Sequence, residues 1–459
     1  MKVTALLLAG TLSILLPVAS ASADSLKSAV QAALTSNPQI KASDANFRAL
    51  TYDLLYTGAG FQPTVTLSGE AGQEYVDNPT GLAPADNRDA KFNSDVRVVA
   101  ELTVFDGFKR ANGVYAAAAR VDQGAFELLD ASETMALMVA EQHINIARQQ
   151  QLLRVARRNQ ARLRKIYDQA QTLLDGGSLP ASDFVQIEMA QFTAQVTIAD
   201  IQRRLQEASA GYKRLTGKAP PAGLQVPKPV RPPSSMEEYV KDSVHNSYRV
   251  RSAGANVDVR AFEKSMAEAE FAPQVKLRAG ASAGRNLDGS RGSEKNVFVG
   301  VGLSWQLYGG KRAERRASLD ERKNEALYQR MAVVRDVEEL ATIAWTSYQI
   351  NSLKRDILGR QVDASQTMLD NFEAEFEMAT RGVLDLMVAT NRLYNAQIER
   401  VNSDAILSFS GFRALAAQSR LANHFGVAQS NRVLASQIAP SAGQKPRDVI
   451  SKGRLLLDK

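Results

Sequence analysis

A stretch of seventy residues without proline, from Gly107 to Gly176, constrains this chain more than any other feature. At about 1.5 Å per residue, a continuous helix of that length would be on the order of 100 Å long. Positions taken at alternating steps of three and four form a heptad seam along the whole stretch. The seam is rich in alanine and includes serine and glutamine, so we expect a long helix that packs closely against neighbours. Its members are Val114, Ala118, Val121, Ala125, Leu128, Ser132, Met135, Val139, Gln142, Ile146, Gln149, Leu153, Ala156, Gln160, Leu163, Tyr167, Ala170 and Leu174.

The amino terminus predicts export from the cytoplasm. Lys2 precedes an apolar run over residues 5–18, and Ala21-Ser22-Ala23 follows it, as in a signal peptide spanning residues 1–23. Beyond that segment there is no run of about 18 apolar residues, the length that a membrane-spanning helix requires. The cysteine count of zero excludes disulfides, thiolate metal sites and a lipid-accepting cysteine. The mature chain is therefore expected in the periplasm, the outer membrane or the medium.

The formal net charge of +7 raises the question of a nucleic-acid partner. Export removes that partner, so we expect no nucleic-acid binding and interpret the basic residues of the long helix as a solvated face. These residues are Arg148, Arg154, Arg157, Arg158, Arg162, Arg164 and Lys165.

Residues 63–105 alternate between apolar and polar side chains with a period of two, which predicts a β-hairpin with a long loop between residues 77 and 89. Asp95, Arg97 and Glu101 lie in the middle of its second strand, where the core of a sandwich would not accept them. A membrane barrel needs one apolar face and one polar face over about ten residues. An ordinary half-exposed sheet fits this hairpin equally well, and the hairpin alone does not choose between them.

The second half of the chain repeats the first, with offsets of 202 to 210 residues. The repeated segments are Phe61-Gln62-Pro63 and Phe271-Ala272-Pro273, Gly107-Phe108-Lys109-Arg110 and Gly309-Gly310-Lys311-Arg312, and Gly211-Tyr212-Lys213-Arg214-Leu215 and Gly411-Phe412-Arg413-Ala414-Leu415. We predict a signal peptide at 1–23, a first repeat at 24–219, a proline-rich connector at 220–234, a second repeat at 235–426 and a disordered tail at 427–459. Within the repeats we predict hairpins at 63–105 and 273–307, long helices at 107–176 and 311–380, and return helices at 183–215 and 385–415.

Four strands per chain are too few to close a membrane barrel, because the smallest barrels need about eight and an open edge leaves backbone groups unpaired in lipid. Several copies must each donate four strands. The long helices likewise need neighbours on both sides. At the two strand-to-helix junctions, Asp106-Gly107 and Gly309-Gly310, we expect glycine to supply the backbone angles that the change of period requires.

The order and duplication of these motifs resemble the TolC family of outer-membrane efflux and type I secretion channels. The resemblance implies a mainly helical chain with membrane strands, which assembles as a homotrimer. In that trimer a twelve-strand β-barrel in the Gram-negative outer membrane is continuous with a twelve-helix α-barrel in the periplasm. It also implies an exit duct, in contact with outer-membrane lipid, that serves a periplasmic adaptor (membrane fusion) protein and an inner-membrane pump of RND or ABC type. The resemblance does not identify the cargo, which could be drugs, as in multidrug resistance, other small molecules or secreted protein.

By the same resemblance, bonds among the helix turns close the periplasmic end of the tunnel. Arg381 opposite Asp183 would form a charge-assisted latch, and Asp385 of each chain would form a negative ring that favours cations. Phe376 and Val388 depart from the family pattern, since they replace a tyrosine hydroxyl and a second aspartate. The alternative is that Asp183 and Asp385 cap the return helices. The turns would also receive the adaptor, through Gly177, Leu179, Ser182, Thr380, Gly382 and Leu384.

Nothing in the sequence indicates an enzyme or a cofactor. The three histidines, His143, His245 and His424, are dispersed, and the motifs of serine hydrolases, zinc proteases and P-loop enzymes are absent. We interpret the histidines as surface or packing residues. The main alternative function is a soluble periplasmic coiled-coil adaptor or scaffold, whose strands would need no lipid-facing side. A simple porin would require strands where the long helices are predicted.

Overall fold

Two very long helices dominate the computed structural model, α3 (Lys109–Asp175) and α7 (Arg312–Glu377). Each is followed by a return helix, α4 (Ala181–Thr216) or α8 (Val383–Ala417). These bounds lie within three residues of the predicted ones. The remaining helices are α1 (Ala21–Ser36), α2 (Pro38–Ala59), α5 (Met236–Asn246), α6 (Tyr248–Glu268), the 3-10 helix η1 (Ala269–Phe271), α9 (Leu421–His424) and α11 (Pro446–Leu457).

The structure describes residues 21–75, 90–287, 292–427, 438 and 444–457. Most of the predicted signal peptide and the loop of the first hairpin lie outside the described residues. The chain divides into two units, and each contains segments of both sequence repeats. We call residues 41–131, 244–338 and 429–459 the sheet unit, and residues 1–40, 132–243 and 339–428 the turn unit.

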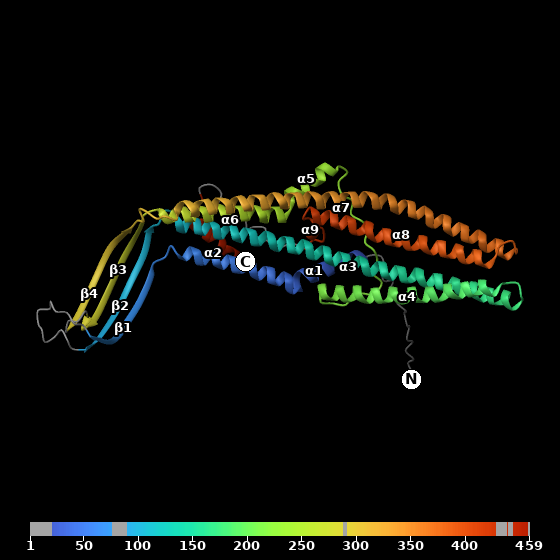
Figure 1. Ribbon diagram of the computed structural model, residues 1–459, viewed down its shortest axis with the longest axis horizontal. Helices are drawn as coiled ribbons and strands as arrows, with labels where there is room; N and C mark the ends of the chain where they lie inside the picture. Colours follow the sequence, from blue (N-terminus) through green and yellow to red (C-terminus); the bar gives the residue numbers. More distant parts are fainter. Residues whose placement is uncertain (1–20, 76–89, 288–291, 428–437, 439–443, 458–459) are drawn as a thin grey trace, which may run out of the picture. The chain divides into compact units, whose positions relative to one another are not determined.

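The sheet unit contains one antiparallel sheet whose four strands lie side by side in chain order (Figure 1). The strands are β1 (Thr64–Tyr75), β2 (Ala90–Phe105), β3 (Gln274–Arg285) and β4 (Ser293–Ser304). The predicted hairpins are therefore present, and β2 and β3 join them to each other. Among the described residues, β1 and β4 are each paired along one side only.

The register collects the apolar side chains of all four strands on one face. Val65 lies opposite Ala100, Ala100 opposite Ala279, and Ala279 opposite Val299. Residues opposite each other in a sheet share a face, so this row is apolar across the whole width. The side chains at its two ends are largely exposed, Val65 by 69% and Val299 by 76%.

The opposite face of the sheet is polar. Both carboxylate oxygens of Glu101 are paired, one with Lys276 at 2.7 Å and the other with Arg278 at 2.8 Å. Asp95 pairs with Arg97 on the same face. Phe298 is an apolar exception, and its ring lies over Gly280, where a Cβ atom would come within 2.8 Å of it.

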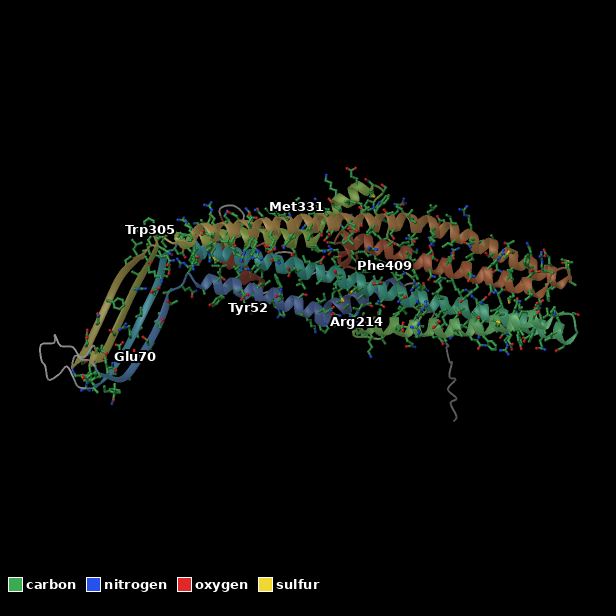
Figure 2. The ribbon with its side chains drawn as sticks, viewed as in Figure 1. Tyr52, Glu70, Arg214, Trp305, Met331 and Phe409 are labelled. Carbon is green, nitrogen blue, oxygen red and sulfur yellow. The ribbon has the colours of Figure 1, made fainter. Side chains whose placement is uncertain are left out.

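The two junctions between strand and long helix differ. Gly107 has a φ of 65°, and a Cβ atom there would lie 2.2 Å from that of Ala272, so this position requires glycine as predicted. The same prediction for Gly309-Gly310 is wrong, because neither glycine has a positive φ. There β4 ends at Ser304, and Trp305 donates its indole N–H to the carbonyl of Phe271, at the end of the sheet where the chain leads into α7 (Figure 2). Residues 305–307, predicted as strand, therefore serve as a connection.

The heptad seam of α3 is covered along its whole length, since every predicted member is buried or half-buried. In the turn unit, Leu152, Val155 and Ala156 of α3 pack with Ile201 of α4 and Val401 of α8. Leu369 of α7 packs with Ala389 and Leu393 of α8. The first cluster thus joins α3, α4 and α8, and the second joins α7 to α8; α4 also contacts α8 directly. We call α4 and α7 the end helices, because each carries exposed apolar side chains. None of the helices in the described part of the chain is both long enough and apolar enough to cross a membrane.

The proline-rich connector, residues 220–234, crosses three of these helices. Ser408 of α8 donates a hydrogen bond to the carbonyl of Pro227, and Trp345 of α7 donates one to that of Pro233. On α3, the connector lies beside His143, which is fully buried. Burial lowers the pKa of His143 to about 4, an effect that the neighbouring backbone of Gln225 offsets only in part.

The prediction of a disordered tail at 427–459 is wrong for its last part. Residues Pro446–Leu457 form α11, whose Val449 and Leu456 are buried. Gly453 lies against α2, where a Cβ atom would come within 2.7 Å of Leu54. Spacings of three and four residues between these positions make one side of the helix apolar or small, which is sufficient to dock it despite its many charges.

Two buried carboxylates of α3 hold the C-terminal segments by their backbone. Glu133, 3% exposed, accepts hydrogen bonds from the N–H groups of Leu421 and Ala422. Asp122, 5% exposed, accepts one from Ile438. A buried carboxylate requires such partners because its desolvation is otherwise costly. These residues were not singled out from the sequence, because the segments they bind lie about 290 or more residues further along the chain.

Gly411 of α8 allows the connector to approach the helix backbone. A Cβ atom there would lie 2.5 Å from the carbonyl oxygen of Val230, so we expect Gly411→Ala to displace the connector and to destabilise the fold by about 1 to 3 kcal/mol. Limited proteolysis within residues 220–234, together with thermal unfolding, measures the effect. Gly211→Ala is the matched control at the corresponding place in the first repeat. There the Cβ atom meets only the flexible end of Gln142, at 3.0 Å, so cleavage should stay at the wild-type rate. Equal sensitivity of the two variants would contradict the contact.

Candidate gate at the helix turns

The turns that end α3 and α7 lie together at one end of the turn unit (Figure 1). Both turns use the same hydrogen bonds, 202 residues apart. Ser178 donates to Leu173 and Thr380 to Glu375, while Gly177 donates to Leu174 and Ala379 to Phe376, all between backbone groups. This paired arrangement is the Schellman motif, in which one residue takes a left-handed conformation. That residue is Gly177 in the first turn, with φ 70°, and Ala379 in the second, with φ 56°.

Asp183 and Asp385 occupy equivalent places in the return helices. Each is the third residue of its helix, and its N–H donates to the carbonyl of the N-cap residue, Pro180 or Gly382. Neither aspartate is the N-cap, so the alternative that they act as capping residues is wrong. Both carboxylates nevertheless lie in the first turn, where the partial positive charge of a helix terminus favours an anion.

Arg381 is held by its own turn. Its guanidinium pairs with Glu375 at 2.7 Å and lies over the ring of Phe372, 4.2 Å from the ring centre. Within this chain the arginine therefore does not pair with Asp183, whose carboxylate accepts a hydrogen bond from Ser182 at 3.3 Å. A bond between Arg381 and Asp183 stays a prediction. Glu375 and Phe372 were not predicted as partners of Arg381, although they precede it by only six and nine residues.

An apolar cluster joins the two turns. Its buried members are Ile166 and Ala170 of α3, Ile187 of α4, and Val383 and Leu386 of α8. Leu179, Leu384 and Phe376 pack against it and are half-buried. Phe376, which replaces the family's tyrosine, thus contributes a ring to this cluster. Val388 is 44% exposed.

The remaining residues predicted to receive an adaptor, Gly177, Ser182, Thr380 and Gly382, are exposed. The hydroxyl of Thr380 donates to the carbonyl of Glu375, so it reinforces the turn. Gly382 adopts an extended conformation with φ −81°. The six predicted docking residues therefore combine four exposed positions with two leucines that are anchored in the cluster.

Two of the three histidines serve in packing, and His245 is exposed. His143 lies under the connector, and His424 contacts the rings of Phe412 and Phe425. Within the described residues, no group of histidine, aspartate and glutamate is arranged to hold a metal ion.

The first repeat of this chain is similar in sequence to a known family of proteins. Residues 29–218, which cover almost all of the first repeat, match the family model described as outer membrane efflux protein. The predicted family resemblance is therefore confirmed over that part of the chain. The family is one of efflux proteins, in agreement with the prediction that the chain is not an enzyme. A search of curated protein sequences found no match.

Solved structures extend the similarity of fold to most of the chain. The outer membrane protein VceC of Vibrio cholerae has 17% identity and a TM-score of 0.76, and the match covers 86% of this chain and 96% of VceC. The outer membrane channel CmeC of Campylobacter jejuni has 12% identity and a TM-score of 0.75, and the match covers 99% of this chain and 98% of CmeC. The open state of the outer membrane channel MtrE of Neisseria gonorrhoeae has 15% identity and a TM-score of 0.72, and the match covers 90% of this chain and 95% of MtrE.

The two Schellman turns permit a reciprocal experiment. A residue with a side chain in the left-handed region costs about 1 to 2 kcal/mol relative to glycine, so Ala379→Gly should stabilise the second turn and Gly177→Ala should weaken the first. Hydrogen–deuterium exchange of peptides covering residues 174–182 and 376–384 measures both effects. We expect Thr380 to gain protection in the first variant and Ser178 to lose it in the second. If exchange changed in neither peptide, left-handed strain would not determine the stability of the turns.

Proposed function

We propose that this chain is one subunit of an outer-membrane channel that serves as the exit duct of a tripartite efflux pump or a type I secretion system. The observation that carries the proposal is the four-stranded sheet, which is apolar on one face, polar and ion-paired on the other, and open at both edges. The family match and the solved channels of similar fold support it.

The sheet has the dimensions and chemistry of part of a membrane barrel. β1, β3 and β4 each have 12 residues, enough for a tilted strand to cross a bilayer. Lipid would contact the row from Val65 to Val299, and the paired Glu101, Lys276 and Arg278 would line a water-filled interior. Because unpaired backbone groups are not tolerated in lipid, β4 of one copy must pair with β1 of the next. We infer a homotrimer, in which three sheets make a barrel of twelve strands.

The helices of the turn unit call for the same assembly. α4, one of the two end helices, carries an exposed apolar row of Val185, Met189, Phe192 and Val196. α7, the other end helix, carries Ile343, Ile350 and Ile357 at spacings of seven residues, and these are 42%, 58% and 47% exposed. Two heptad seams without a partner in their own chain are suited to contact each other between copies. Three copies would then form a tunnel of twelve helices that leads into the barrel.

The remaining partners follow from the same family. We propose that the turns receive a periplasmic adaptor of the membrane fusion class, and that an inner-membrane pump of RND or ABC type supplies the cargo. We locate the channel in the outer membrane of a Gram-negative cell, with its helices in the periplasm. The competing function, a soluble coiled-coil adaptor or scaffold, gives no role to the exposed apolar face of the sheet.

Adjacent residues of β4 test the assignment of the two faces. Val299→Arg would place a charge in lipid, at a cost of about 2 to 4 kcal/mol near the middle of the bilayer, and should abolish insertion. Gly300→Arg places the same side chain on the polar face, in open space, and should preserve insertion and trimer formation. Fractionation, heat-modifiable migration and conductance in planar bilayers are the measurements. Recovery of the wild-type chain as a monomer in the soluble periplasmic fraction would instead favour the adaptor or scaffold.

The gate is tested in the same bilayers. We propose that Asp183 and Arg381 restrict the periplasmic end, so Arg381→Ala and Asp183→Ala should each raise single-channel conductance severalfold. Glu375→Gln should have a similar effect if its pairing with Arg381 is part of the restraint. Asp385→Lys should abolish cation preference, since it reverses the charge of the proposed ring. The control is Asp175→Ala, which removes an exposed carboxylate near the end of α3 that accepts a hydrogen bond from Gln171. Wild-type conductance in all of the first three variants would place the restriction elsewhere.

A further inference from the structure

The turn unit carries a strongly basic surface that the channel function does not use. Residues 142–167 of α3 contain no aspartate or glutamate but seven arginines and lysines. Five of the seven are exposed, and we call them the basic stripe: Arg154, Arg157, Arg158, Arg164 and Lys165. Among the described residues, none of the five takes part in an ion pair. Two acidic side chains of the adjoining helices pair with other arginines, Glu207 with Arg203 and Asp404 with Arg355.

The stripe occupies the side of α3 that the connector crosses. A cavity of about 370 Å³ lies beneath connector residues 224–229 and is lined on α3 by Ala147, Gln151 and Arg154. Residues seven apart lie on the same side of a helix. Arg158 and Lys165 continue the line of Gln151 at that spacing, so the stripe begins under the connector and extends beyond it toward the turn. From Arg154 to Lys165 it is about 16 Å long.

A second copy of the chain does not cover this surface in the proposed assembly. α3 packs against both α4 and α8 within its own chain. The seams left for contact between copies belong to α4 and α7. The stripe must therefore face either the tunnel or the periplasm. Because the connector crosses the same side of α3, and bonds to α8 and α7, it would obstruct an open tunnel if that side were internal. The stripe therefore lies outside.

We propose that the basic stripe binds the carboxylate-bearing polymer of the cell wall, peptidoglycan, and thereby anchors the channel where it crosses the periplasm. The inference rests on the proposed outer-membrane location. Peptidoglycan stems present many carboxylates along an extended network, and arginine pairs with carboxylates through two parallel hydrogen bonds. Each exposed ion pair is weak, but three stripes per trimer on one polymer act together. Since exposed pairs are screened by salt over a Debye length of about 8 Å, binding should weaken as ionic strength rises.

Co-sedimentation of the purified detergent-solubilised protein with isolated peptidoglycan sacculi tests the proposal. The variant combines Arg154→Gln, Arg158→Gln and Lys165→Gln, and it should bind about tenfold more weakly, as expected for the loss of three exposed pairs of ordinary strength. The matched control combines Arg322→Gln, Arg335→Gln and Arg392→Gln. These three residues are also exposed and without an ion pair in the described part of the chain, and the net charge changes equally. The control should bind as the wild type does.

Two further arms separate the possible outcomes. Sacculi whose carboxylates have been converted to amides should lose the wild-type protein, while unmodified sacculi retain it at low salt. Single-channel conductance of the stripe variant should equal that of the wild type, because the stripe lies outside the tunnel. Equal binding by variant and control would overturn the proposal, as would undiminished binding to amidated sacculi. If the stripe variant bound sacculi normally but lost its adaptor in co-purification, the stripe would be an acidic-protein surface. If the wild-type protein formed no channel, the proposed function would fail independently of sacculus binding.

Discussion

The backbone of an edge strand needs hydrogen-bond partners, and this requirement governs the proposed assembly. Among the described residues, β1 and β4 are each paired along one side only, and in the proposed location the apolar face of the sheet would contact lipid. Lipid offers no hydrogen bonds, so strands of identical copies would be the remaining partners. The helices reach the same result by a different interaction, because α4 and α7 each carry an apolar row that their own chain does not cover. Two independent surfaces therefore call for association, one through backbone hydrogen bonds and one through side-chain packing.

The two repeats keep the same backbone geometry and differ in how they use it. The turns after α3 and α7 have identical hydrogen bonds, yet one has glycine at the left-handed position and the other has alanine. Only the second has an arginine, Arg381, fixed by Glu375 and Phe372. Gly211 and Gly411 show the same divergence, since only the latter accepts the connector against its backbone. The connector is present once in the chain, so one repeat had to provide a path for it.

Features set by nearby residues could be predicted from the sequence. The heptad seam of α3 and the alternation in the strands each depend on a local period, and the structure places these elements within three residues of their expected bounds. The register of the sheet could also be anticipated in part, because a shift by one residue would reverse the faces.

Features that depend on distant partners could not be predicted. The resemblance implies Asp183 as the partner of Arg381, whereas within the chain Arg381 pairs with Glu375, because pairing depends on the path of the turn. Glu133 binds the backbone N–H of Leu421, 288 residues further along the chain, and no local pattern distinguishes it from the other charges of α3. α11 was not predicted because its sequence is rich in charged residues. Only three buried positions, Val449, Gly453 and Leu456, dock it. In each case the decisive interaction joins residues whose proximity no local pattern encodes.

The composition of α3 suits a long, close-packed helix in the proposed channel, which would have to open. Alanine in the seam lets neighbouring helices approach, but polar members reduce the stability that each contact supplies. Gln149 and Asn159 are buried, at 2% and 5% exposure, and each has a side-chain oxygen without a hydrogen-bond partner in the described part of the chain. A polar group in that state costs about 1 to 3 kcal/mol. In the proposed channel, such positions would lower the cost of sliding α3 against α4 and α8. The apolar cluster at the turns, where Ile166 and Ile187 meet Val383, instead keeps the two turns together as one element.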